Sequence, residues 1–241
     1  MIKLEKGETP DYLSEDKIKD LIEKFKVKSL SVWNHEEIKQ ALLESSHFKC
    51  AYCECELQIE DSYMEVEHFK CKSLYPEEVV NWDNLLPSCK RCNNKKGSLD
   101  VEIFPIINPY KEDPKEHLLI QDCRLYAKEG KGSKGYNVIK KLALNDEERL
   151  ILARLKVSNQ INSYIEDWID NIQNIDFVRN GMLKTLQLCQ PDKPFSAFLA
   201  FTLLNNKDTK IIKQVLIDND LWDDDLNEMY ETCKKIALDS R

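Results

Sequence analysis

Long hydrophobic runs are missing from this chain. None of its apolar stretches approaches the roughly 20 residues that a helix needs to cross a bilayer. The first residues, "MIKLEKGETPDYLSEDK", are charged from the start and lack the apolar segment of a secretory signal peptide. We therefore expect a soluble protein that stays in the reducing cytoplasm.

An excess of positive charge is also missing. The 35 Lys and Arg residues are outnumbered by 43 Asp and Glu residues, so the formal net charge is −8. Because the surface as a whole does not attract a polyanion, any contact with nucleic acid has to be made by a local basic patch. The charge balance weighs against a DNA-coating protein but not against an enzyme with a small basic site.

A nucleotide-hydrolysis motif is the third absence. The stretch "GKGSKG" at 130–135 is rich in glycine and lysine, but it lacks the Walker spacing and follows no buried strand. We interpret it as a polar hairpin turn. The chain also contains no internal repeat and no low-complexity linker.

Helical periodicity marks both ends of the chain, while the middle is irregular and rich in cysteine. The chain has 241 residues, of which 42% are hydrophobic, enough for one large domain or two small ones. We divide it into a helical segment 1–49, a module 50–105 and a helical C-terminal domain 106–241 that docks a partner. The expected helices are 14–26 with Ser14 as N-cap, 34–47 with Asn34 and Glu37 as a capping box, two helices within 135–172 that break near Asn145, and 177–189, 195–206, 208–218 and 222–238.

Four of the nine cysteines form two close pairs. "CAYC" contains Cys50 and Cys53, "CKRC" contains Cys89 and Cys92, and 35 residues separate the pairs. Two such pairs in a reducing compartment match four thiolates around a structural zinc ion. The alternatives are ordinary core cysteines, which would require two coincident spacings, and a redox pair, which would need a thioredoxin-like βαβ pattern.

Other residues near these pairs leave the ligand set open. Cys55 is a spare thiol beside the first pair, and His47 is a possible substitute ligand. We interpret the remaining cysteines as structural. They are Cys71, Cys123, Cys189 and Cys233.

Three polar features lie between the pairs or directly after them. Glu67 and His68 end the strand-like stretch "MEVEH", Asn84 precedes the apolar "LLPSC", and Asn93 follows the last paired cysteine. Taken singly, these would be a strand histidine, a solvated carboxylate, and turn or cap residues. Their shared order inside a cysteine frame favours a catalytic site instead.

This order resembles the HNH endonucleases over about residues 50–99. The resemblance implies an α+β fold in which a zinc-clamped ββα-metal finger is embedded in a mostly α-helical chain. It implies that His68 takes a proton from the attacking water, that Asn84 orients the loop that holds this base, and that Glu67 and Asn93 hold one divalent cation.

The residue types suit those roles. The ordinary pKa of histidine, about 6.5, is close to neutral pH, as a general base requires. Carboxylate and amide oxygens are hard ligands that Mg²⁺ and Mn²⁺ prefer. Residues two apart in a strand share a face, so Glu65 is an alternative to Glu67 as the metal ligand. A basic cluster after the strand suits contact with phosphate, and it comprises Lys90, Arg91, Lys95 and Lys96.

A narrower resemblance extends into the helical part of the chain. "NWDNLLPSCKRCNNKKGS", "IINPYKEDPKEHL" and "NVIKKLALN" are similar to the PtuB-type nuclease subunits of Septu antiphage systems and certain retrons. This resemblance implies an ATPase partner of the PtuA type, consistent with the missing Walker motif. The acidic run 218–228 would repel DNA and could dock such a partner.

We therefore predict a metal-dependent endonuclease that hydrolyses DNA phosphodiester bonds within an antiphage complex. One alternative is a zinc-stapled module that binds DNA or protein without cutting. Another is a stand-alone restriction or homing nuclease.

Overall fold

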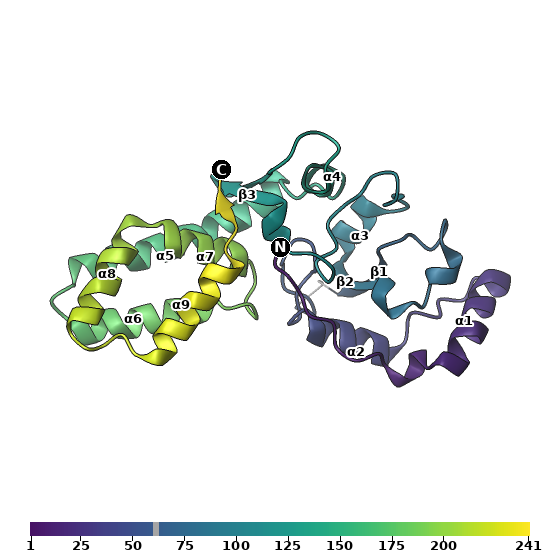
Figure 1. Ribbon diagram of the computed structural model, residues 1–241, viewed down its shortest axis with the longest axis horizontal. Helices are drawn as coiled ribbons and strands as arrows, with labels where there is room; N and C mark the ends of the chain where they lie inside the picture. Colours follow the sequence, from purple (N-terminus) through teal and green to yellow (C-terminus); the bar gives the residue numbers. More distant parts are fainter. Residues whose placement is uncertain (60–62) are drawn as a thin grey trace. The chain divides into compact units, whose positions relative to one another are not determined.

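The computed structural model describes residues 1–59 and 63–241, and the described chain forms two compact units (Figure 1). The first unit contains residues 3–117 and 127–144, and the second contains 118–126 and 145–241. The structure thus groups residues 106–117 and 127–144 with the cysteine-rich module, whereas we grouped them with the C-terminal helices from sequence. Residues 60–62 of the predicted module lie outside the described residues.

The centre of the first unit is a ββα element. Strands β1 (Met64–His68) and β2 (Leu85–Cys89) pair antiparallel, with Glu67 opposite Leu86. Helix α3 (Lys90–Lys96) follows β2 directly and ends where the N–H of Gly97, at a φ of 51°, bonds to the carbonyl of Asn93. The connection between the strands contains two short 3₁₀ turns, η2 (Pro76–Glu78) and η3 (Trp82–Asn84). The mixed fold class predicted from sequence is confirmed.

Two N-terminal helices accompany this element. Helix α1 (Glu15–Lys28) begins after Ser14, as predicted, and α2 (Glu36–Ser45) contacts both strands on the face opposite α3 (Figure 1). The predicted capping box of α2 is wrong, because the cap is His35 and the Glu37 carboxylate instead accepts a hydrogen bond from the N–H of Tyr12 at 3.0 Å. The side chains that α2 buries follow the expected helical period, Ile38, Leu42 and Leu43.

The glycine- and lysine-rich stretch is not a hairpin turn. The turn between β3 (Leu118–Gln121) and β4 (Arg124–Ala127) falls at Asp122 and Cys123, which both have positive φ. Residues 130–133 instead lead from β4 into helix α4 (Lys134–Lys141), whose first turn is capped by the Ser133 hydroxyl. The prediction failed because "GKGSKG" contains a helix cap as well as turn residues.

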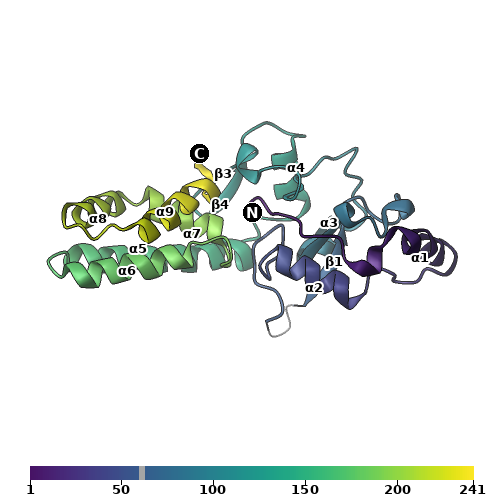
Figure 2. The same cartoon turned by 60° about the horizontal axis from the view of Figure 1, so that its bottom comes forward.

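The second unit is a bundle of helices. A turn of π-helix (Glu147–Ile151) leads into α5, which α6 accompanies along its length (Figure 2). The break predicted near Asn145 and the later helices are confirmed within two residues. They are α5 (Leu152–Asp170), α6 (Ile175–Leu188), α7 (Ser196–Asn205), α8 (Lys207–Asp218) and α9 (Asp224–Ile236).

A close contact joins the first two helices of this bundle. Gly181 on α6 lies against the indole of Trp168 on α5, and a Cβ atom at Gly181 would fall 2.3 Å from Trp168 Nε1. Only glycine leaves room for the indole here. The two-residue strand β5 (Asp239–Ser240) ends the chain by pairing parallel with β3. No helix in the described ranges combines the length and the apolar character needed to span a membrane.

Candidate active site and cysteine cluster

Five cysteine thiols converge beside the ββα element. The sulfur atoms of Cys50, Cys53, Cys55 and Cys89 all lie within 4.8 Å of one another, and Cys53 Sγ is 3.3 Å from Cys55 Sγ and 3.8 Å from Cys89 Sγ. Cys92 interacts with the thiols of Cys50, Cys53 and Cys89. The predicted quartet is therefore brought together, and Cys55, which we treated as a spare thiol, lies in the same cluster.

The cysteines of the cluster lie on three segments of the chain that a bound ion would hold together. The turn that carries the first pair is tied to β2, because the N–H of Ala51 bonds to the carbonyl of Pro87 at 3.0 Å. Cys89 ends β2 and Cys92 lies in the first turn of α3. An ion held here would join the turn, the strand and the helix.

The donor set fits zinc, which binds four thiolates in closed structural sites. Hydrogen bonds among the thiols, first from Cys50, lower the pKa of Cys53 and of Cys89, so part of the cluster favours the thiolate form. Burial raises the pKa of Cys50 in the metal-free protein. A bound cation would offset that cost, because it stabilises the thiolate form.

Glu67 lies inside the module and is paired with a lysine. Its carboxylate is 2.5 Å from the Lys96 ammonium, both side chains are buried, and the same ammonium donates to the carbonyl of His68 at 2.7 Å. Burial raises the pKa of Glu67 to about 7, against the opposing effect of Lys96. Our prediction placed Lys96 in a surface patch, but its side chain is fully buried and forms an ion pair with Glu67. Lys96 therefore does not belong to that surface.

Asn93 contacts the other glutamate of the strand. Its Nδ2 donates to the Glu65 carboxylate at 2.6 Å. Asn93 and Lys96 are three residues apart on α3, so they meet Glu65 and Glu67 along one face of β1. Two carboxylates and an amide on this face form a set of hard oxygen donors that fits Mg²⁺ or Mn²⁺. Asn93 therefore makes a hydrogen bond to Glu65, whereas Glu67 forms an ion pair with Lys96.

His68 is oriented by its neighbours. Its Nε2 lies 2.9 Å from the carbonyl of Val79. Because a carbonyl can only accept, Nε2 carries the hydrogen and Nδ1 keeps its lone pair. Burial lowers the pKa of His68 to about 4, and the charges of Lys72 and Lys96 act in the same direction. The imidazole is therefore neutral at pH 7, as a base must be.

Asn84 braces the chain after this histidine. Its side-chain oxygen accepts from the N–H of Lys70 at 2.7 Å, and its amide donates to the carbonyls of Lys70 and Glu78 at 3.0 Å each. Its own carbonyl accepts from the N–H of Phe69 at 2.8 Å. This buried residue thereby ties the end of β1 to the loop that supplies the Val79 carbonyl.

The sequence did not reveal two further residues beside His68. The ring of Trp33 stands perpendicular to the imidazole at 4.9 Å, and the Lys72 ammonium lies 4.9 Å from the same indole. Trp33 lies in the connection between α1 and α2, far from the cysteine module in sequence. No local pattern could have found it. The remaining members of the predicted basic cluster are exposed on α3, and they are Lys90, Arg91 and Lys95.

Residues 50–99 match the family model for HNH endonucleases. The ββα element and its cysteine frame therefore define an HNH endonuclease domain. The whole chain is 37% identical over 249 residues to the Septu protein PtuB of Bacillus thuringiensis, covering 99% of this chain and 95% of the relative. A Septu protein PtuB of Bacillus mycoides (strain KBAB4) is 29% identical over 203 residues, covering 72% of this chain and 65% of that relative. The chain belongs to the PtuB family of Septu proteins.

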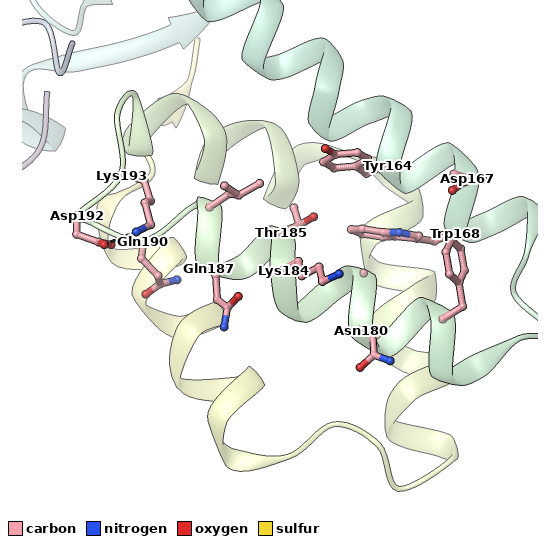
Figure 3. A pocket seen from close by; sticks show the side chains of 13 residues that line it. Tyr164, Asp167, Trp168, Asn180, Lys184, Thr185, Gln187, Gln190, Asp192 and Lys193 are labelled. Carbon is pink, nitrogen blue, oxygen red and sulfur yellow. Dashed lines mark hydrogen bonds and ion pairs between the residues drawn. The ribbon is translucent and has the colours of Figure 1, made fainter. Parts of the chain in front are cut away.

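A large cavity of the second unit contains none of the candidate site residues. It has a volume of about 860 Å³ and lies along α5, α6 and the loop after α6 (Figure 3). Tyr164 and Trp168 form one wall with nearly parallel rings 6.4 Å apart. Lys184 and Asn180 add polar groups from α6. The candidate nuclease residues belong to the first unit, and the second unit has a cavity of its own.

Proposed function

We propose that this chain is a metal-dependent endonuclease that hydrolyses DNA phosphodiester bonds, and that it is the nuclease subunit of an antiphage complex. The observation that carries the proposal is the orientation of His68. A neutral imidazole whose Nε2 donates to Val79 presents Nδ1 as a base, one residue away from a carboxylate on the metal-ligand face of β1.

His68 Nδ1 takes the proton of the attacking water in this mechanism. The Val79 carbonyl stabilises the resulting imidazolium through Nε2, and Asn84 holds the loop on which Val79 lies. Burial of His68 makes its protonated form costly, so the proton is passed on readily to solvent or product.

Glu67 and Asn93 would hold the catalytic cation, Mg²⁺ or Mn²⁺. When bound, this ion neutralises charge on the phosphate and assists the departing 3′ oxygen. Glu67 has to exchange its contact with Lys96 for the ion, while Glu65 orients the Asn93 amide. A separate structural Zn²⁺ would be held by Cys50, Cys53, Cys89 and Cys92.

Contact with DNA is assigned to the exposed basic residues of α3, Lys90, Arg91 and Lys95. These cations can bind phosphate oxygens without reading sequence. We also propose that an ATPase subunit of the PtuA type is the partner, that it docks on the helical C-terminal part, and that both act in the cytoplasm. Membership of the PtuB family supports the choice of partner.

The decisive experiment is plasmid cleavage by wild type and His68→Ala, in the presence of the ATPase partner and Mg²⁺ or Mn²⁺. We expect His68→Ala to lower the cleavage rate at least 100-fold, because general-base catalysis contributes factors of about 10² to 10⁴. His35→Ala, a histidine outside the module, is the matched control and should cut like wild type. Undiminished cutting by folded His68→Ala would refute the mechanism.

A non-catalytic, zinc-stapled binding module is the second candidate. The Lys96 ammonium on the Glu67 carboxylate favours it, since a cation already occupies that carboxylate. On this alternative, Cys53→Ser abolishes phage defence by unfolding the module, whereas His68→Ala leaves defence intact. A stand-alone nuclease would cut DNA at full rate without the ATPase partner.

A further inference from the structure

We propose that Lys72 is a catalytic residue that binds the phosphate being cut, and that Trp33 is the positioning residue that holds it there. The inference rests on the proposed nuclease function and deepens it. It adds to the active site a segment that precedes the HNH domain in the chain.

The position of the Lys72 backbone is well defined. It lies in a turn directly after β1, where the N–H groups of Leu74 and Tyr75 both bond to the carbonyl of Cys71, at 3.1 and 3.0 Å. The Cys71 thiol also lies 3.6 Å from the carbonyl of Ser98, just beyond α3. The turn thereby keeps Lys72 close to the end of the strand that carries His68.

The Lys72 side chain differs from the neighbouring lysines in its partners. Lys70 pairs with Glu102 at 2.7 Å and Lys96 pairs with Glu67. Within the described part of the chain, the Lys72 ammonium has no carboxylate in ion-pair range, and its recorded contact is the indole face of Trp33 at 4.9 Å. The side chain is half-buried, so the ammonium is held in place and remains available to a substrate anion.

The Lys72 ammonium lies near the candidate base. It and the His68 imidazole both contact the indole of Trp33, each 4.9 Å from that ring. Phosphodiester hydrolysis builds negative charge on the phosphate oxygens. A cation that shares the Trp33 indole with the base is placed to stabilise that charge.

Trp33 contacts both the His68 imidazole and the Lys72 ammonium. Its ring stands at 89° to the His68 imidazole, and the Lys72 ammonium lies over the same indole. The indole is held in turn by Phe25 of α1, at 5.7 Å between ring centroids and an interplanar angle of 76°. The connection between α1 and α2 therefore places an aromatic surface against the base and under the cation.

The test measures kcat and KM for DNA cleavage by the complex with its ATPase partner. Lys72→Gln should lower kcat about 100-fold with little change in KM, because the contact strengthens as charge develops. Lys72→Arg should recover most of this loss. Lys70→Gln, two residues away, is the control and should retain wild-type kinetics. Each variant is compared with wild type in thermal unfolding and zinc content.

A double-mutant cycle of Trp33 and Lys72 tests the role of Trp33. Trp33→Phe should retain most of the activity, and Trp33→Ala should lose most of it. In the Trp33→Ala background, Lys72→Gln should cost far less than 100-fold, because the ammonium is already misplaced. Fully multiplicative effects would overturn the role of Trp33. A kcat for Lys72→Gln within twofold of wild type would overturn the role of Lys72.

The outcome for His68 separates this inference from the nuclease proposal. If His68→Ala is inactive while Lys72→Gln cuts normally, only the present inference fails. If His68→Ala cuts like wild type, the nuclease mechanism fails whatever Lys72 does.

Discussion

At the scale of single residues, strand β1 separates two kinds of chemistry. Glu65 and Glu67 face α3, where they meet Asn93 and Lys96, while His68 takes the other side of the strand. The period of two in a strand thus gives the proposed metal ligands and the proposed base different surroundings. The open question from sequence was which glutamate is the ligand.

The two glutamates should differ in their effect on catalysis. We expect Glu67→Gln to lower kcat at least 100-fold, since it removes an anionic ligand beside the base. Glu65→Gln should cost about 10-fold, because the second shell of a metal site typically contributes 10- to 100-fold. Cleavage rates across a Mn²⁺ titration measure both. The reverse order would identify Glu65 as the ligand.

The buried histidine should make stability depend on pH. Burial lowers the His68 pKa to about 4 from its ordinary 6.5, so between these values the unfolded chain binds a proton that the folded chain does not. Stability should therefore fall as the pH falls through this range, by about 2.5 kcal/mol at pH 4.5 relative to pH 7.

A variant without the imidazole isolates this contribution. The free energy of unfolding of His68→Asn, measured in urea at both pH values, should lack this part of the decrease. Carboxylates and cysteines titrate in both proteins, so the difference between the two decreases is the quantity of interest. Equal decreases would show that the pKa of His68 is the same in the folded and unfolded chains.

At the scale of elements, the cysteine cluster combines contacts that are local in sequence with contacts that are distant. Each CxxC pair brings two thiols together within a few residues. The hydrogen bond from the Ala51 N–H to the Pro87 carbonyl of β2 holds the first pair beside the second. Cys55 joins the same cluster from the turn at residues 50–55. Five thiols exceed the four that a tetrahedral zinc ion accepts.

Zinc content should identify the fourth ligand. Cys92 is fully buried in α3, so we expect Cys92→Ser to lose the zinc ion and unfold the module. Cys55→Ser should keep one zinc ion per chain and melt like wild type. Metal analysis with circular dichroism tests this, and loss of zinc from Cys55→Ser but not from Cys92→Ser would exchange the two assignments.

At the scale of the whole molecule, a net charge of −8 has to be reconciled with the proposed DNA substrate, which is also anionic. The acidic helix start at Asp223, Asp224 and Asp225 belongs to the second unit. The exposed basic residues Lys90 and Arg91 belong to α3 in the first. DNA affinity should therefore depend on a few local cations and on salt.

Neutralising these cations should weaken the salt dependence of DNA binding. Changing Lys90, Arg91 and Lys95 to Gln takes the net charge from −8 to −11 and should reduce the slope of log K against log salt by up to about 3. The control changes the α1 lysines Lys19, Lys26 and Lys28, with the same final charge and an unchanged slope. Equal slopes for both triple variants would assign DNA binding to another surface.

The sequence by itself determined the features that depend on short spacing. The helices are confirmed because their apolar period repeats within a few turns, and the HNH domain because its motif lies within 50–99. Tertiary structure decided the partners of each side chain. Glu67 with Lys96, Asn93 with Glu65, and Trp33 against His68 each join segments at least 28 residues apart. Such pairs depend on strand register and helix packing, which spacing along the chain does not encode.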